Sequence, residues 1–190
     1  MDKLNKWFLG FWNRSVILTY IELCIAVGGI CASANGKYWT AVICLALCGV
    51  CDAFDGKIAR ATKRSADACV FGIQIDSLCD LVSFGVLPSA IGHCAGIRGI
   101  GVAVLMLYSL CAVIRLGYFN VTEQKRQQET SENRKEFEGL PVTWSSVIVP
   151  LVSLLHLVIR GQGFAWILGL VLLAVGLCFI SHLRVGKPQI

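Results

Sequence analysis

Six apolar stretches, each long enough to cross a lipid bilayer, constrain the fold of this chain more than any other feature. They are found at about residues 15–35, 38–55, 74–96, 98–120, 142–160 and 163–182. A bilayer core of about 30 Å is spanned by roughly 20 apolar residues in a helix. The composition, 56% hydrophobic and only 15% charged, excludes an ordinary soluble domain. We therefore predict an all-α, polytopic protein with six transmembrane helices in one membrane domain over residues 15–190.

The first 14 residues are predicted to lie on the membrane surface. The segment "MDKLNKWFLGFWNR" places aromatic residues and leucine between Lys3, Lys6 and Arg14. It is too polar for the core of a signal peptide and lacks a cleavage site of small residues. Interleaved basic and apolar residues are typical of an interfacial amphipathic helix, so we expect residues 1–14 to form one and to be retained.

Lysine and arginine are distributed unevenly between the two sides of the predicted bundle. With the N-terminus inside, the outer turns hold only Lys37, Arg98 and Arg160, and Arg115 lies within a span. The positive-inside rule then places both termini and the aspartate-rich segments on the cytoplasmic side. We expect the protein to lie in the cell membrane of a prokaryote. The net charge of +5 is explained by topology and by attraction to anionic lipids, without nucleic acid as a partner.

Ten cysteines would suggest disulfides in a small secreted protein, but nine of them lie in or at the edges of apolar spans. Small, polarizable side chains fit close helix packing, so we predict a packing role. Cys48 and Cys51 form a C-x-x-C motif within a predicted helix. A redox or zinc role is disfavoured there, because no βαβ pattern surrounds the motif.

Two polar segments separate the apolar stretches. Residues 56–73 are predicted to be a short charged connector, and residues 121–140 are the most polar part of the chain. The second segment is either a helical extension of the fourth span or a mobile loop.

Four aspartates border the first connector. On each helix the aspartates share one face with small residues, and on the second span also with an arginine, because these residues are three or four positions apart. The residues are Asp52, Asp55, Gly56, Ala59 and Arg60 on the second span, and Gly72, Asp76 and Asp80 on the third. A short connector makes these helices antiparallel neighbours. We therefore expect the four carboxylates to converge at the cytoplasmic edge of the bilayer.

Such a cluster requires cations. A carboxylate at membrane depth costs roughly 2.5–3.5 kcal/mol on insertion scales, and neighbouring carboxylates raise one another's pKa. An all-oxygen ligand set suits Mg²⁺, Mn²⁺ or Ca²⁺ better than zinc, and two ions about 3.5–4 Å apart can clamp a phosphoryl group. The small residues beside the acids would leave a recess for a ring or a pyrophosphate, although small residues also serve helix packing.

The segments "DAFDGKIAR" and "GIQIDSLCD", eleven residues apart, resemble the signature of the CDP-alcohol phosphatidyltransferases at all eight fixed positions. The resemblance implies a six-helix, usually homodimeric membrane enzyme that displaces CMP from CDP-diacylglycerol with an alcohol, using two divalent cations, Mg²⁺ or Mn²⁺. It also implies a role for each motif residue: Asp52, Asp55, Asp76 and Asp80 as metal ligands, Asp80 also as the general base, and Gly56, Ala59, Arg60 and Gly72 at the CDP group.

The acceptor alcohol is indicated by three further features, which resemble the branch of the family that uses L-serine. These are the eleven-residue spacer, the run "DSLCDLVSFGVLPSA" from Asp76, and "FEGLP" at residues 137–141. Arg115 adds a physical reason, since an arginine within a span needs an anionic partner and the carboxylate of serine is one. Asn120 is a weaker candidate for serine. The alternatives are an arginine that binds lipid phosphate or a protein acid, and an enzyme that uses glycerol 3-phosphate or inositol phosphate.

Two questions stay open at the level of the sequence. Glu22, within the first span, is expected to pair with Arg115, to contact the serine ammonium or to face a dimer interface. The main alternative from another functional class is a cation transporter. Such a protein would place its acids near the bilayer midplane in two related halves, whereas here they lie in one hairpin with no second copy.

Overall fold

The computed structural model describes residues 10–11, 14–61, 66–129, 136–159, 161–182 and 184–186. Within these ranges, the description does not extend to the side chains of residues 14–15, 55–61, 66, 126–129, 136–138 and 184–186.

The described chain is almost entirely helical. Its elements, in order, are α1 (Arg14–Ala34), α2 (Tyr38–Ala61), α3 (Ala66–Asp80), the π-helix η2 (Leu81–Val86), α4 (Leu87–Cys94), η3 (Gly99–Gly101), α5 (Val102–Glu129), β1 (Glu136–Glu138), η4 (Val142–Trp144), α6 (Ser145–Ser153), η5 (Leu154–Leu157), α7 (Gln162–Phe179) and β2 (Arg184–Gly186).

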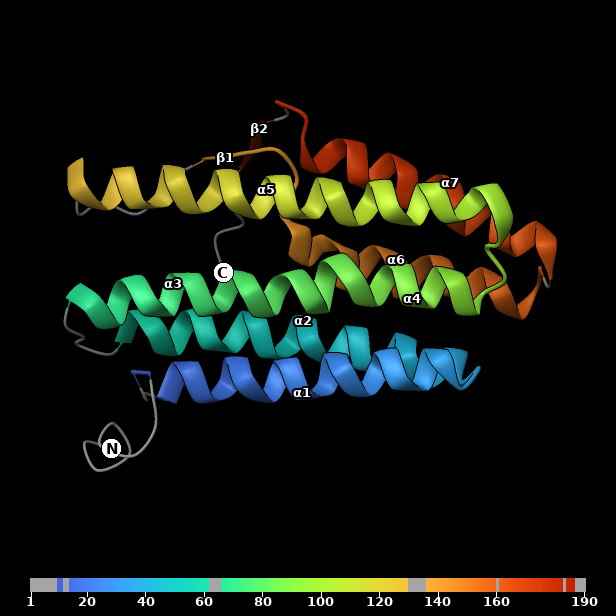
Figure 1. Ribbon diagram of the computed structural model, residues 1–190, viewed down its shortest axis with the longest axis horizontal. Helices are drawn as coiled ribbons and strands as arrows, with labels where there is room; N and C mark the ends of the chain where they lie inside the picture. Colours follow the sequence, from blue (N-terminus) through green and yellow to red (C-terminus); the bar gives the residue numbers. More distant parts are fainter. Residues whose placement is uncertain are drawn as a thin grey trace.

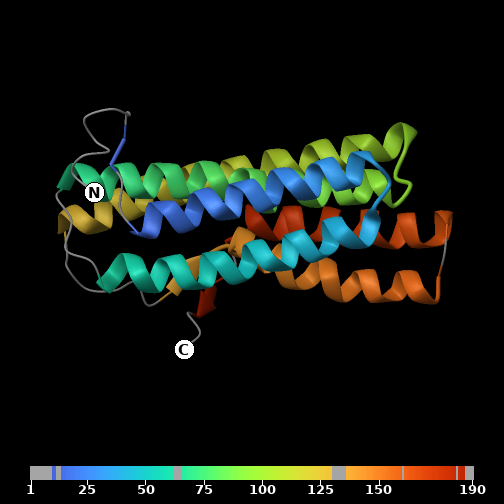
Figure 2. The same ribbon diagram turned by 90° about the horizontal axis from the view of Figure 1, so that it is seen from below.

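The helices run side by side along the long axis of the molecule and alternate in direction (Figures 1 and 2). The π-helix η2 joins α3 and α4 without a break, so these three elements form one long rod. At one end of the bundle α2 ends and α3 begins, and α5 also ends there (Figure 1). We call this the aspartate end, because Asp52 and Asp76 lie toward it, and we call the other end the far end.

The core is formed where helices from both halves of the chain meet. The most extensive contacts are between α1 and α2, between α5 and α7, and between α2 and α6. Large side chains fill the space between them, including Phe84, Tyr108, Phe164 and Phe179, all at most 1% exposed. All ten cysteines are free thiols.

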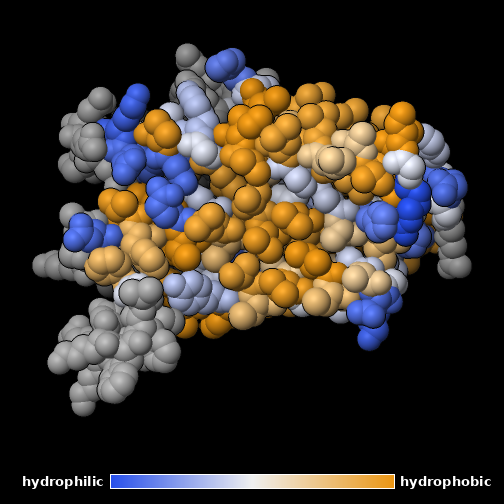
Figure 3. All heavy atoms as spheres, in the orientation of Figure 1, coloured by the Kyte–Doolittle hydropathy of each residue, from blue (hydrophilic) through white to orange (hydrophobic). Residues whose placement is uncertain are grey.

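The outside of the bundle is apolar in its middle and polar at both ends (Figure 3). In the part of the chain that the structure describes, four helical segments are long and apolar enough to cross a membrane: Val16–Ala34, Asp67–Cys94, Gly99–Lys125 and Gln162–Phe179. Large apolar side chains on them point outward, such as Met106 (69% exposed) and Leu170 (65%). Outward-facing apolar surface on this scale is unfavourable in water and favourable in lipid, so the prediction of an all-α membrane protein is confirmed.

Of the two alternatives for residues 121–140, the helical extension is the one found as far as Glu129, because α5 continues to that residue. Two other details differ from the sequence-based expectations. Residues 56–73 are not a connector in full, because α2 continues to Ala61 and α3 begins at Ala66. A short antiparallel ladder between β1 and β2 was not predicted; it pairs Glu136 with Gly186 and Glu138 with Arg184. The predicted interfacial helix over residues 1–14 lies almost wholly outside the described residues.

Candidate functional site

The candidate site contains two carboxylates that lie on different helices. Asp52, near the end of α2, and Asp76, on α3, are both half-buried. They lie close enough for their negative charges to repel each other. Repulsion between partly desolvated carboxylates is relieved by protonation or by a cation, so this pair is suited to hold a positive charge.

Asp80 lies one helical turn beyond Asp76 on the same face of α3. It is the last residue of α3 and directly precedes the π-helix η2. Its side chain is only 7% exposed. The two α3 aspartates therefore differ in depth: Asp76 is at the half-exposed rim and Asp80 is farther inside the bundle.

The two aspartate-bearing helices are not packed tightly on each other. α3 packs more extensively on α1 and on α5 than on α2, which packs mainly on α1 and α6. The second and third spans are antiparallel neighbours, as expected (Figure 1), but α2 contacts the rod mainly through α4 and not through α3.

The donor chemistry of the site fits divalent cations. Its acids are carboxylates, which are the ligands that Mg²⁺ and Mn²⁺ prefer. Among the side chains that the structure describes, no three His, Cys, Asp or Glu residues come together as a ready ligand set. Asp52, Asp76 and Asp80 do not form a complete metal site by themselves. Convergence of all four carboxylates remains a prediction, because the side chain of Asp55 lies outside the description.

The rest of the predicted nucleotide face is only partly described. Gly56, Ala59 and Arg60 belong to α2, but their side-chain positions, like that of Asp55, lie outside the description. Gly72 is half-buried on α3, one turn before Asp76. The spacing argument for α2 stands, because the helix continues through residue 61.

The π-helix after Asp80 is held by hydrogen bonds from α5 and α6. Pro88 has no N–H, so it cannot donate to the carbonyl of Phe84 four residues earlier. The Tyr108 hydroxyl donates to that carbonyl instead, at 2.7 Å, and Ser145 Oγ donates to it at 3.4 Å. π-helical turns occur frequently at functional sites. The π-helix η2 begins directly after Asp80, so its hydrogen bonds help to hold the end of α3 in place.

Arg115 is buried in α5, at 6% exposure. Its Nε donates a hydrogen bond to the carbonyl of Leu140 at 3.3 Å, and its guanidinium lies 5.8 Å from the ring centre of Phe119. A backbone carbonyl and an aromatic ring thus orient this side chain. It is buried and does not snorkel to the bilayer surface, and the alternative of pairing with a protein acid stays open.

Asn120, five residues farther along α5, has a structural contact. Its side-chain oxygen accepts a hydrogen bond from Ser77 Oγ at 2.7 Å. Ser77 directly follows Asp76, so Asn120 ties α5 to the part of α3 that carries the aspartates. Its predicted role in serine binding is untested.

Glu22 is fully buried in α1, at 0% exposure within a single chain. The thiol of Cys48 on α2 donates to its backbone carbonyl at 3.6 Å. An exposed position at a dimer interface is therefore wrong for Glu22. Pairing with Arg115 and contact with the serine ammonium stay open.

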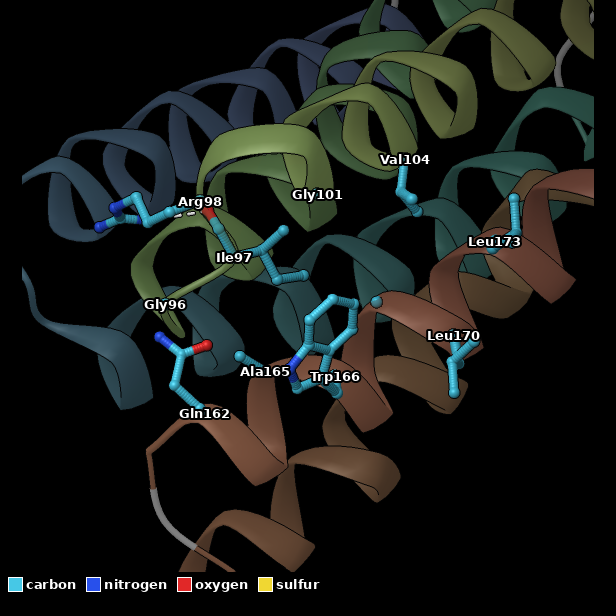
Figure 4. A pocket seen from close by; sticks show the side chains of 11 residues that line it. Gly96, Ile97, Arg98, Gly101, Val104, Gln162, Ala165, Trp166, Leu170 and Leu173 are labelled. Carbon is cyan, nitrogen blue, oxygen red and sulfur yellow. Dashed lines mark hydrogen bonds between the residues drawn. The ribbon is translucent and has the colours of Figure 1, made fainter.

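A cavity of about 90 Å³ lies at the far end, away from these residues. Figure 4 shows its walls, with Ile97 and Val104 on one side and Trp166, Leu170 and Leu173 of α7 on the other. None of its lining residues is acidic. The cavity thus lacks ligands for a metal, and the aspartate end remains the candidate site.

Comparison with known proteins identifies the family. The sequence model of the CDP-alcohol phosphatidyltransferases matches residues 12–180, nearly the whole chain. The chain belongs to the CDP-alcohol phosphatidyltransferase family. The aspartates of α2 and α3 lie within the matched region.

Several members of this family with assigned names are similar to the chain. The CDP-diacylglycerol–serine O-phosphatidyltransferase of Bacillus subtilis is 28% identical over 180 residues, which cover 90% of this chain and 89% of the relative. The protein of the same name from Saccharomyces cerevisiae is 41% identical over 96 residues, 50% of this chain and 34% of the relative. The archaetidylserine synthase of Methanothermobacter thermautotrophicus is 33% identical over 122 residues, 63% of this chain and 48% of the relative. The matches thus span half or less of the yeast and archaeal proteins.

Sequence reasoning missed the residues that support the site. Pro88, four residues after Phe84, was a signal that one helical carbonyl needs another donor, but the sequence does not show that Tyr108 supplies it. Ser77 lies inside the aspartate motif, but the motif does not show that its hydroxyl bonds to Asn120. Gly139 lies in the run "FEGLP", and the sequence does not show that it lies beside Arg115.

Proposed function

We propose that the chain is a CDP-diacylglycerol–serine O-phosphatidyltransferase, which converts CDP-diacylglycerol and L-serine to phosphatidylserine and CMP. The proposal rests on family membership and on relatives of that name in bacteria and yeast. The observation that carries the chemistry is the Asp52–Asp76 pair with the buried Asp80 one turn deeper.

Each aspartate has a distinct part in the proposed reaction. Asp52, Asp55, Asp76 and Asp80 would hold two divalent cations, Mg²⁺ or Mn²⁺, with Ca²⁺ possible. Bound there, the cations would neutralise the diphosphate and stabilise the departing CMP. Gly56, Ala59, Arg60 and Gly72 would line the space for the CDP group, because small side chains let a flat ring approach the helix backbone.

Proton transfer is assigned to Asp80. The serine hydroxyl has a pKa far above 7 and must lose its proton as it attacks. A new bond forms between the serine oxygen and the phosphorus of the phosphatidyl group, and the bond between that phosphorus and the CMP oxygen breaks. The proton passes to a carboxylate oxygen of Asp80, whose burial keeps bulk water from competing for this position.

Serine recognition is assigned to Arg115. Its guanidinium is buried and oriented, and an arginine fork binds a carboxylate with two parallel hydrogen bonds. Asn120 remains a weaker candidate, since its side-chain oxygen already accepts from Ser77. A cation transporter is not favoured, because the family is one of transferases.

The proposed arrangement in the membrane has six crossings. The two apolar helices Tyr38–Phe54 and Val142–Leu157 are shorter than the four long segments. They run alongside the other helices in the bundle (Figure 2), and this position supports the proposal that they also cross the membrane. We place both termini and the aspartate end in the cytoplasm of a prokaryotic cell, in contact with membrane lipids, and we propose a homodimer as in the family.

An acceptor panel tests the proposal. Purified protein in detergent is given CDP-diacylglycerol with Mg²⁺ or Mn²⁺ and one of serine, glycerol 3-phosphate or inositol phosphate, and CMP release is measured. We expect release with serine alone. Release with another acceptor and none with serine would refute the choice of serine and leave the transfer chemistry intact.

A further inference from the structure

Gly139 lies where three distant segments of the chain meet. Its φ angle is +77°, a conformation that favours glycine. A Cβ atom at this position would lie 2.6 Å from the carbonyl oxygen of Phe179, 3.1 Å from that of Ser181 and 3.3 Å from Nε of Arg115. Any other residue would therefore meet both an unfavourable backbone conformation and a steric clash with backbone atoms.

The residue after Gly139 connects α7 to Arg115. The N–H of Leu140 donates to the carbonyl of Cys178 at 3.1 Å, which is one of the last carbonyls of α7 and lacks a helical partner. The carbonyl of the same residue accepts from Arg115 Nε at 3.3 Å. The end of α7 thus holds the segment, and the segment holds the guanidinium.

The strand ladder holds the segment of Gly139 and Leu140 next to the end of α7. β1 immediately precedes Gly139 and pairs with β2, which follows α7. Figure 1 shows β2 next to the end of α7. Gly139 allows the chain to pass from the ladder onto the carbonyls of Phe179 and Ser181 without displacing Arg115.

We propose that Gly139 is a positioning residue for the acceptor: it places the Leu140 carbonyl against Nε of Arg115 and so directs the Nη end of the guanidinium toward the serine carboxylate. This inference rests on the proposed function. It divides the site into two parts. CDP-diacylglycerol and the cations are held by α2 and α3, and the acceptor is held by α5, the segment before α6 and the end of α7.

The test compares two glycine-to-alanine variants. Gly139→Ala should raise the KM for serine about tenfold or more and leave the KM for CDP-diacylglycerol within about twofold of wild type, as expected when one acceptor contact is lost. Gly36→Ala is the matched control, since Gly36 has a φ of +71° and no atom within 4 Å of its Cβ position. It introduces the same kind of backbone strain at the far end, and both KM values should stay unchanged.

A double-mutant cycle separates positioning from general damage. If Gly139 acts through Arg115, adding Gly139→Ala to Arg115→Lys should raise the KM for serine much less than it does in the wild type. Additive effects, or equal changes in both KM values, would overturn the inference. Should Gly139→Ala fail to fold, Phe119→Leu replaces it, because it removes the ring that packs on the same guanidinium, and an unchanged KM for serine would then overturn the inference.

The wild-type protein separates this inference from the proposed function. No CMP release with serine in the wild type would refute both. Serine-dependent release in the wild type, with Gly139→Ala and Gly36→Ala behaving alike, would refute only the role of Gly139.

Discussion

Ser77 on α3 donates a hydrogen bond of 2.7 Å to the side-chain oxygen of Asn120 on α5. Ser77 directly follows Asp76, so this hydrogen bond joins α5 to the rod that carries Asp76 and Asp80. Side-chain hydrogen bonds between membrane helices contribute about 0.6 kcal/mol on average and up to about 1.7 kcal/mol.

Ser77→Ala should therefore lower the stability of the bundle by about 0.5–1.5 kcal/mol, because the Asn120 oxygen loses its donor. Thermal unfolding in detergent measures the change. Ser33→Ala is the matched control, since Ser33 Oγ is buried and has no hydrogen-bond partner in the described part of the chain. A loss as large for Ser33→Ala as for Ser77→Ala would contradict this account of the bond.

Tyr108→Phe should destabilise the protein by about 0.5–1.5 kcal/mol, the usual net contribution of one hydrogen bond. The Phe84 carbonyl cannot bond to Pro88 and would keep the longer bond from Ser145. Because the π-helix begins directly after Asp80, we also expect slower CMP release. An unchanged melting temperature together with an unchanged rate would show that the Tyr108 hydroxyl does not support the π-helix.

Gly49→Ala should separate α2 from α6. A Cβ on Gly49 would lie 2.6 Å from Cβ of Ser146 and would overlap its hydroxyl, which is held by a 2.6 Å hydrogen bond to the Thr143 carbonyl. Overpacking of this kind costs about 1–3 kcal/mol. In contrast, Gly28→Ala on α1 meets no atom within 4 Å and should be neutral or slightly stabilising in the same unfolding assay. Equal stabilities of the two variants would argue against tight α2–α6 packing.

Asp80→Asn should reduce serine-dependent CMP release by about 10²–10⁴-fold, the usual contribution of a general base. Asparagine has nearly the same size, so the variant should insert and unfold like the wild type. Activity near the wild-type level in well-folded Asp80→Asn would remove this residue from proton transfer.

The sequence was sufficient for the helices and the motif because both depend on local patterns. Apolar runs of about 20 residues predict membrane helices regardless of tertiary detail, and the spacing of three and four placed Asp76 and Asp80 on one face of a helix that the structure contains. The fully helical path of α2 to Ala61 was underestimated, because charged residues near a bilayer edge resemble a loop in composition.

The supporting contacts could not be predicted, because they join residues far apart in the chain. The partners of the Phe84 carbonyl come from α5 and α6, and Arg115 is oriented by Leu140, 25 residues later. A hydropathy pattern gives the identity of a helix face but not which neighbour it meets. The packing of α3 on α1 and α5 in preference to α2 is a result of this kind.

The most direct test of the central claim follows isotope-labelled serine into lipid. Purified protein is incubated with CDP-diacylglycerol, labelled L-serine and Mg²⁺ or Mn²⁺, and the organic extract is examined for labelled phosphatidylserine. The account predicts that label enters the lipid with one CMP released per serine, that a chelator stops the reaction, and that restoring the cation restarts it. Label that stays entirely in the aqueous phase with active, cation-loaded protein would contradict it.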